Sequence, residues 1–139
     1  MKFGVIGEHL KHSFSKEIHE KIADYSYVVK EIEPDNLGTF LTEAEFCGIN
    51  VTIPYKEKVI PYLCEISDTA KKIGAINTVV NKNGKLYGYN TDVDGMNYML
   101  NKVGVSVKDK VVMILGGGGT SNTAVTLCKR ENAKIYRVV

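Results

Sequence analysis

Short apolar runs alternate with amphipathic stretches along most of the sequence, and this alternation limits the folds that the chain can adopt. The apolar runs are rich in β-branched residues, which favour strands, and they read KFGVIG, YSYVVKEIE and CGINVTI. The first amphipathic stretch places Ile18 and Ile22 at helical spacing, and Pro34 begins the second. Because parallel strands need a crossover that is usually a helix, the order β-α-β-α-β predicts an α/β fold with a mainly parallel sheet.

Further elements are expected downstream of this first group. Short helices are predicted around residues 57–63 and 67–73, and a hairpin follows in NTVVNKNGKLYGY, with its turn at Lys82-Asn83-Gly84. The apolar residues of DVDGMNYMLNKVG then fall on one helical stripe that ends at Gly104. This pattern indicates a connecting helix.

A second β-α-β unit begins after Gly104. It consists of the apolar run KVVMIL, the segment GGGGTSNTAVTLCKREN and the strand AKIYRVV. We therefore expect a domain boundary near residues 104–109, with one domain at 1–104 and the start of another at 105–139. A unit of about thirty residues cannot bury enough surface to be stable alone, so we expect either that part of it is missing or that something else covers it.

The composition excludes several classes of protein. Hydrophobic residues make up 44% of the 139 positions, which is ample for a buried core. The net charge is +2, with no block of like charges, and this balance indicates no nucleic-acid partner. No stretch approaches the ~20 apolar residues of a membrane span, and the first apolar run is too short for a signal peptide. We expect a cytoplasmic protein with no membrane partner.

The cysteines and histidines lack the spacing of metal ligands. Cys47, Cys64 and Cys128 are far apart and form no CxxC pair, so we expect buried free thiols in a reducing compartment. The histidines have neither a regular helical face nor neighbouring carboxylates, and they are His9, His12 and His19. We therefore expect no metal site.

The segment LGGGGTS lies between a predicted strand and a predicted helix. Gly116, Gly118 and Ser121 match a GxGxx(G/A/S) pattern, in which backbone amides and the helix N-terminus attract a pyrophosphate. The alternative is that the glycines only make a tight turn. Tyr136 and Arg137 stand near the position that reads the ribose, and neither is acidic, so the sequence itself does not choose between NAD and NADP.

Polar residues recur where the predicted strands of the first domain end, which is the edge where ligands bind in open α/β sheets. Uncharged hydroxyls and amides suit a polyhydroxylated ligand, because each side chain both donates and accepts. The residues are Ser13, Ser15, Asn50, Thr52, Asn77, Asn90, Thr91 and Asp92. Each has a simpler interpretation. The serines and Asp92 also suit helix caps, the asparagines suit turns, and Lys56 suits an exposed lysine.

Five motifs, in a fixed order, carry a resemblance that decides between these interpretations. They are KHSFSKEIH, GINVTIPYKEKV, GAINTVV, GYNTDVDG and LGGGGTS, and their order and intervals resemble those of the shikimate dehydrogenase family over essentially the whole chain. A single glycine motif would be much less specific. The resemblance implies a three-layer αβα substrate-binding domain at 1–104, followed by the first β-α-β unit of an incomplete Rossmann-like NADP-binding domain at 105–139.

The resemblance also implies a role for each site residue. Lys56 and Asp92 would be the catalytic pair beside the reacting hydroxyl, with Ser13 and Ser15 holding the carboxylate of shikimate. The residues that contact the ring substituents would be Asn50, Thr52 and Asn77. The cofactor residues would be Asp68, on the nicotinamide side, and Gly116, Gly117, Gly118, Gly119, Thr120 and Ser121, around the pyrophosphate of NADP. Asp68 equally suits a helix cap.

The implied reaction is the reduction of 3-dehydroshikimate to shikimate with NADPH, in the biosynthesis of chorismate and the aromatic amino acids. A quinate/shikimate dehydrogenase is a close alternative, and a non-catalytic module that binds shikimate or a similar hydroxy-acid is an alternative of another class. Family members continue well beyond this sequence, so we expect the 139-residue chain alone to be impaired or inactive. The open edge of the strand AKIYRVV also predicts self-association, for example as a homodimer.

Overall fold

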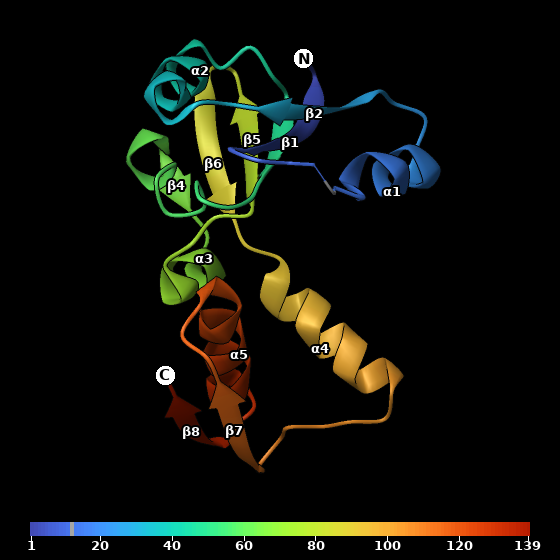
Figure 1. Cartoon of the computed structure of the whole chain (residues 1–139), viewed down its shortest axis with the longest axis vertical. Coiled ribbons are helices and arrows are strands. Elements are labelled where there is room, and N and C mark those ends of the chain that lie inside the picture. The colour runs from blue at the N-terminus through green and yellow to red at the C-terminus, as the bar shows by residue number, and fades with distance from the viewer. Residues whose placement is uncertain (12) are drawn as a thin grey trace. The chain divides into compact units, whose positions relative to one another are not determined.

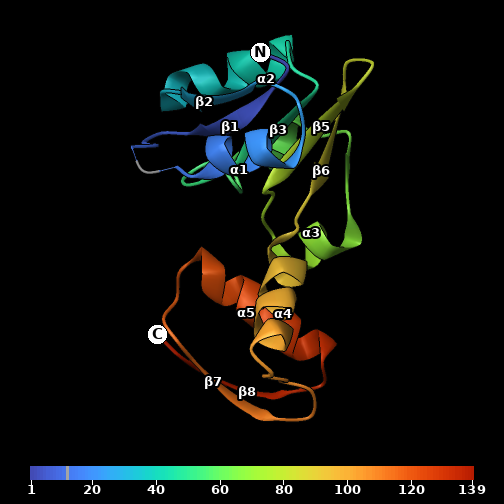
Figure 2. The same ribbon diagram turned by 90° about the vertical axis from the view of Figure 1, so that its right-hand side faces the viewer.

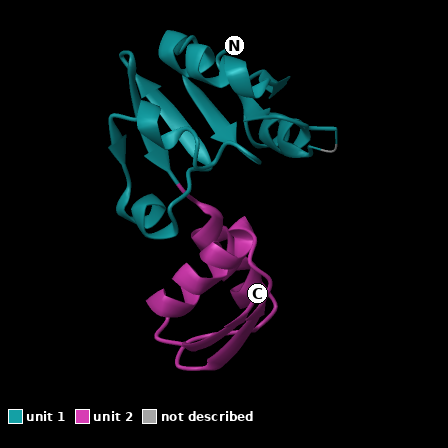
Figure 3. Ribbon diagram, turned by 60° about the vertical axis from the view of Figure 1, so that its left-hand side comes forward, with its two compact units in different colours: residues 1–89 teal, residues 90–139 magenta. Residues whose placement is uncertain are grey.

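The computed structural model describes residues 1–11 and 13–139, so His12 lies outside the described residues. The chain divides into two compact units, Met1–Tyr89 and Asn90–Val139, which Figure 3 shows in different colours. The domain boundary expected near residues 104–109 from the change in composition stays a prediction.

The described residues of the first unit form six strands, three α-helices and two short 3-10 helices (Figure 1). In chain order they are β1 (Phe3–Gly7), α1 (Ser15–Ile22), β2 (Tyr27–Glu31), η1 (Pro34–Asn36), α2 (Leu37–Glu43), β3 (Gly48–Val51), η2 (Ile60–Tyr62), β4 (Glu65–Ile66), α3 (Asp68–Ile73), β5 (Thr78–Lys82) and β6 (Lys85–Tyr89).

These strands form one mixed sheet in the order β2-β1-β3-β5-β6-β4. The pairs β1–β2, β1–β3 and β4–β6 are parallel, whereas β3–β5 and β5–β6 are antiparallel. The β5–β6 hairpin turns at Asn83 and Gly84, whose φ angles are 54° and 81°. A two-residue turn with both φ angles positive matches the twist of the flanking strands, which is why an Asn-Gly pair marks a hairpin.

The core of the first unit lies on one face of this sheet. Ile6, Ile49 and Val79 point toward that face and pack with Leu41 of α2 and Ala70 of α3 in one buried cluster. Side chains alternate across a strand, so Val5 and Asn50 belong to the opposite face. Helix α1 lies on that side, and Figure 2 shows α1 and α2 on opposite sides of β1. The first unit therefore has the expected helix, sheet and helix layers.

The second unit contains α4 (Asp92–Lys102), β7 (Val111–Leu115), α5 (Gly119–Arg130) and β8 (Lys134–Val138). Strands β7 and β8 pair in parallel, with Ile114 opposite Arg137. Ile114, Leu127 and Cys128 are buried in this unit. It is the β-α-β unit that the sequence predicts, preceded by the connecting helix, which ends at Lys102, two residues before Gly104 with its φ angle of 73°.

The α/β class and the mostly parallel sheet are confirmed, and two local predictions need correction. The helix expected at 57–63 is reduced to the short η2, and the two-residue strand β4 was not expected, because a strand of that length carries no pattern. Cys47 and Cys64 are exposed and only Cys128 is buried. Cys47 lies in a bend directly before β3, so the strand alternation that buries Ile49 does not extend to it.

Within the described part of the chain, no helix has both the length and the apolar character needed to cross a membrane.

Candidate functional site

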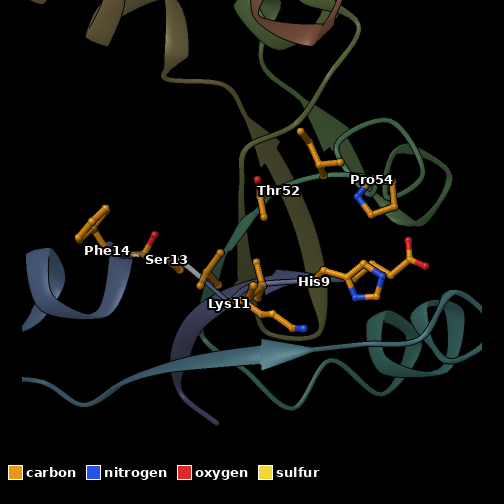
Figure 4. Close-up of a pocket in the computed structure, with 11 residues that line it drawn as sticks. His9, Lys11, Ser13, Phe14, Thr52 and Pro54 are labelled. Atoms are coloured by element: carbon orange, nitrogen blue, oxygen red, sulfur yellow. Dashed lines mark hydrogen bonds between the residues drawn. The ribbon is translucent and has the colours of Figure 1, made fainter.

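A pocket of about 690 Å³ opens beside the carboxyl ends of β1 and β3. Ser13 and Ser15 line it from the start of α1, and Thr52 lines it from the end of β3 (Figure 4). His9 and Lys11 also border this pocket, and the sequence patterns did not single them out for it. The pocket therefore joins residues from two of the five motifs, at the sheet edge where the topology predicts a ligand.

The segment after β3 is held in place by a buried tyrosine. Tyr55 is completely buried, and its hydroxyl donates a hydrogen bond to the carbonyl oxygen of Ile32. Lys56 follows directly and is only half-buried, and its carbonyl oxygen accepts a hydrogen bond of 2.7 Å from the amide of Ile76. The backbone of Lys56 is thus fixed on both sides, and the residue stays partly exposed.

Backbone hydrogen bonds bring Asn77 to the same place. The amide of Val51 donates to the carbonyl oxygen of Asn77 at 2.8 Å, and the amide of Thr52 donates to the carbonyl oxygen of Ile6 at 3.0 Å. The amide of Ile76, next to Asn77, donates to the carbonyl oxygen of Lys56. The segments that carry Thr52, Lys56 and Asn77 therefore adjoin one another. Asn77 itself is buried, with 8% of its surface exposed.

Asn50 has a different environment from the other predicted site residues, because its side-chain amide is engaged within the sheet. Its Oδ1 accepts a hydrogen bond from the hydroxyl of Tyr27 at 2.5 Å. Its Nδ2 lies 3.3 Å from the carbonyl oxygen of Asn77 and 3.2 Å from Oγ1 of Thr78. Thr78 and Tyr27 were not predicted from the sequence, which holds no local pattern for such a long-range network.

An aromatic cluster attaches α1 to the sheet. His19 stacks on Tyr27 with ring centroids 4.0 Å apart, and its Nδ1 lies 2.5 Å from the hydroxyl of Tyr25. The carboxylate of Glu20 accepts a hydrogen bond from the backbone amide of Tyr27, which lowers the pKa of Glu20, and Lys16 lowers it further. Burial raises the pKa of the Tyr27 hydroxyl, so this group stays protonated at neutral pH.

Several residues that suit helix caps do not act as caps. The N-cap of α1 is Phe14, that of α4 is Thr91 and that of α3 is Ser67, whose hydroxyl accepts from the amide of Ala70. Asp68 and Asp92 instead occupy the first helical position of α3 and α4. The capping interpretation of both aspartates is therefore wrong.

In the second unit, Asn90 acts as the turn residue that one of its two interpretations predicts. It is buried, and its Oδ1 accepts a hydrogen bond of 2.9 Å from the amide of Asp92. Asp92 is half-buried at the start of α4. Lys56 belongs to the first unit and Asp92 to the second, so their catalytic pairing stays a prediction. Asp68 lies in the first unit with 91% of its side chain exposed, and 3.8 Å separate it from Lys71.

The glycine turn connects β7 to α5. Gly116 has a φ angle of 111°, which only glycine adopts without strain, and Gly118 is the N-cap of α5. Gly119 and Thr120 form the exposed first turn of the helix, while Ser121 is buried and donates to the carbonyl oxygen of Gly118. The exposed amides at this helix start suit a pyrophosphate, so the turn fits the predicted cofactor group. Among the described residues, no cluster of three potential metal ligands occurs.

Comparison with known proteins shows the family to which this chain belongs. The model of the shikimate dehydrogenase substrate-binding domain matches residues 5–79, which is more than half of the chain. The chain belongs to the shikimate dehydrogenase family. It is 43% identical to the NADP(+) shikimate dehydrogenase of Clostridium beijerinckii, over 98% of this chain and 54% of that protein.

Solved structures agree with this assignment. Shikimate dehydrogenase 1 of Peptoclostridium difficile superposes with a TM-score of 0.89 at 37% identity, over 99% of this chain and 54% of that one. The Thermus thermophilus enzyme in complex with NADP(H) and shikimate superposes with a TM-score of 0.89 at 30% identity, over 99% of this chain and 55% of that one. The chain thus spans about half the length of the relatives it matches.

Proposed function

We propose that this chain acts in the NADPH-dependent reduction of 3-dehydroshikimate to shikimate, the activity of the shikimate dehydrogenase family. The observation that carries the proposal is the convergence of three backbone segments. Those carrying Thr52, Lys56 and Asn77 adjoin through hydrogen bonds, and Thr52 shares its pocket with Ser13 and Ser15. Membership of the family supports the same activity.

In this proposal Ser13 and Ser15 donate hydrogen bonds to the substrate carboxylate, and Thr52 and Asn77 bind the ring hydroxyls. Lys56 donates the proton that the carbonyl oxygen needs when the carbon is reduced, or polarises that oxygen, and Asp92 orients Lys56. Asn50 contributes differently, because its amide already bonds within the sheet.

The glycine turn is the proposed cofactor site, with Gly116 to Gly119, Thr120 and Ser121 around the pyrophosphate of NADP and Asp68 on the nicotinamide side. NADPH supplies the hydride when it is bound. The relatives named for NADP(+), and the Thermus complex with NADP(H), support NADP.

Two measurements test this proposal. The first is titration calorimetry of the chain with shikimate and, separately, with NADP(H), and the second is an absorbance assay of NADPH oxidation. Shikimate binding that weakens at least tenfold in Ser13→Ala/Ser15→Ala, but not in the exposed Ser106→Ala control, would support the substrate site. Absence of shikimate binding would overturn it. Binding without turnover would favour the alternative of a hydroxy-acid binding module, and equal turnover of quinate would favour the broader dehydrogenase.

We also propose that the chain self-associates through β8 and works in the cytoplasm. The two-stranded sheet leaves β8 with an edge that pairs with no other described strand, and such edges recruit further strands. The free thiols of Cys47 and Cys64 are exposed, which suits a reducing compartment. A monomer by light scattering at high concentration would overturn the self-association.

A further inference from the structure

Four side chains form a continuous hydrogen-bonded chain across the sheet of the first unit, on the face that α1 covers. The hydroxyl of Tyr27 lies 2.5 Å from Oδ1 of Asn50, and Nδ2 of Asn50 lies 3.2 Å from Oγ1 of Thr78. Oγ1 of Thr78 lies 2.9 Å from Oδ1 of Asn77. The chain therefore starts at a buried aromatic residue of β2 and ends at a predicted substrate residue.

The direction of these hydrogen bonds follows from one group that only accepts. The carbonyl oxygen of Asn77 has no proton, so the atom of Asn50 that approaches it to 3.3 Å must be Nδ2. Oδ1 of Asn50 then faces Tyr27, and the tyrosine hydroxyl must donate. Nδ2 of Asn50 also donates to Oγ1 of Thr78, and the threonine hydroxyl donates its own proton to Oδ1 of Asn77.

We propose that Tyr27 and Thr78 are positioning residues, which hold the Asn77 side chain in one orientation through this directed chain. The hydrogen bond from Thr78 to Oδ1 of Asn77 favours one orientation of this amide group, because rotation by 180° would exchange a donor for an acceptor at the substrate. The inference rests on the proposed function, because it takes Asn77 as a substrate contact. It also gives Asn50 its role: Asn50 acts through Asn77.

Tyr27 also contacts the helix that carries the proposed carboxylate site. His19 stacks on the Tyr27 ring at 4.0 Å, and Ser15 precedes His19 by one helical turn on α1. None of the eight residues of α1, all of which the structure describes, is buried, so this stacking is a main attachment of the helix. One residue thus supports both ends of the proposed substrate site. Its ring supports α1 and its hydroxyl supports Asn77.

Conservative variants separate these two roles. Tyr27→Phe keeps the ring and its stacking on His19 but removes the hydroxyl that starts the chain. Thr78→Val keeps the side-chain shape but breaks the last link, and Thr78→Ser restores the hydroxyl. Tyr25→Phe is the matched control, because the Tyr25 hydroxyl bonds His19 and belongs to no link of the chain. Circular dichroism and thermal unfolding identify any variant that fails to fold.

The first measurement needs no ligand. Nuclear magnetic resonance of the full chain reports the side-chain amide protons of Asn77, whose shifts and exchange rates depend on the orientation of that group. Tyr27→Phe and Thr78→Val should both change these signals, Thr78→Ser should restore them, and Tyr25→Phe should leave them unchanged. Unchanged Asn77 signals in folded Tyr27→Phe would overturn the inference, since the proposed chain links the Tyr27 hydroxyl to Asn77 through Asn50 and Thr78.

The second measurement is the shikimate dissociation constant of the same proteins. We expect Tyr27→Phe and Thr78→Val to raise it by about three- to tenfold, and the double variant to raise it no further than the larger single effect. Equal affinity in all variants would overturn the positioning role. If the unmodified chain binds no shikimate but the Asn77 signals respond as expected, the proposed function fails while the directed chain stands.

Discussion

Lys56 and Lys58 stand two positions apart and have different environments. Lys56 is half-buried and follows the buried anchor Tyr55, and the amide of Ile76 holds its backbone. Lys58 is exposed, and its Nζ lies 5.8 Å from the centre of the Tyr55 ring. The same residue type is therefore positioned in one case and solvated in the other.

This difference predicts different kinetic effects of one substitution. In the complete enzyme, the acid/base role proposed for Lys56 predicts that Lys56→Ala lowers kcat by about a hundredfold or more, because such a group acts in the transition state. Lys58→Ala should leave kcat within about a factor of two. Steady-state assays of both variants check this, and a rise in KM with unchanged kcat in Lys56→Ala would mean that Lys56 only binds.

At the scale of single elements, α1 depends on contacts at its polar and aromatic residues. The carboxylate of Glu20 accepts from the amide of Tyr27, and this bond lowers the pKa of Glu20 below its ordinary value of 4.5. A lowered pKa means that the bond stabilises the folded state above pH 4.5, and that this contribution is lost as the pH falls through the folded value.

We therefore expect the Tyr27 amide to exchange faster as the pH falls below about 4.5, after correction for the intrinsic exchange rate. Glu20→Gln should abolish this dependence, because glutamine does not titrate. Glu17→Gln should retain it, since Glu17 pairs with Lys21 and not with β2. Nuclear magnetic resonance between pH 3 and pH 6 measures the rates, and an unchanged profile in Glu20→Gln would contradict the role of this carboxylate.

Two glycines in different elements should respond oppositely to the same change. Gly84 has a φ angle of 81° in the hairpin turn, so Gly84→Ala should lower the free energy of unfolding by about 1 kcal/mol. Gly95 lies inside α4 with open space around its Cα, so Gly95→Ala should raise helix stability by up to about 1 kcal/mol. Denaturant unfolding of both variants tests the pair, and equal signs would contradict it.

At the scale of the whole molecule, the two units differ in how much apolar surface they bury. The first unit has a continuous core cluster that spans the sheet and its helices. In the second unit Val111, Met113 and Leu115 of β7 are each more than 60% exposed. A strand with one uncovered apolar face is held by fewer contacts, so it opens more readily.

We expect the amides of β7 and β8 to exchange at least tenfold faster than those of β1 and β3, because local opening costs less free energy there. Hydrogen-exchange mass spectrometry of the chain measures both. The comparison should be repeated at high and low protein concentration, since self-association through β8 would slow exchange only at high concentration. If the amides of β7 and β8 were as protected as those of β1 and β3 at both concentrations, the weaker packing of the second unit would be contradicted.

Much of the fold and part of the site could be predicted because they depend on neighbouring residues. Strand and helix periods, the Asn83-Gly84 turn and the glycine turn before α5 arise from local sterics and hydrogen bonding, so short windows of sequence contain them. The order of the five motifs likewise indicated the family. The caps were predicted poorly: Ser67 caps α3 although Asp68 suits that position equally by composition.

The amino-acid sequence by itself determined most of the element order, the α/β class and the family of this protein. Only the tertiary structure decided which side chains meet: that Tyr55 anchors the segment of Lys56, and that Asn50 bonds Tyr27 and Thr78. The physical reason is that a hydrogen bond between β2 and β3 joins residues 23 positions apart. Such contacts depend on strand order and register, which no local pattern specifies.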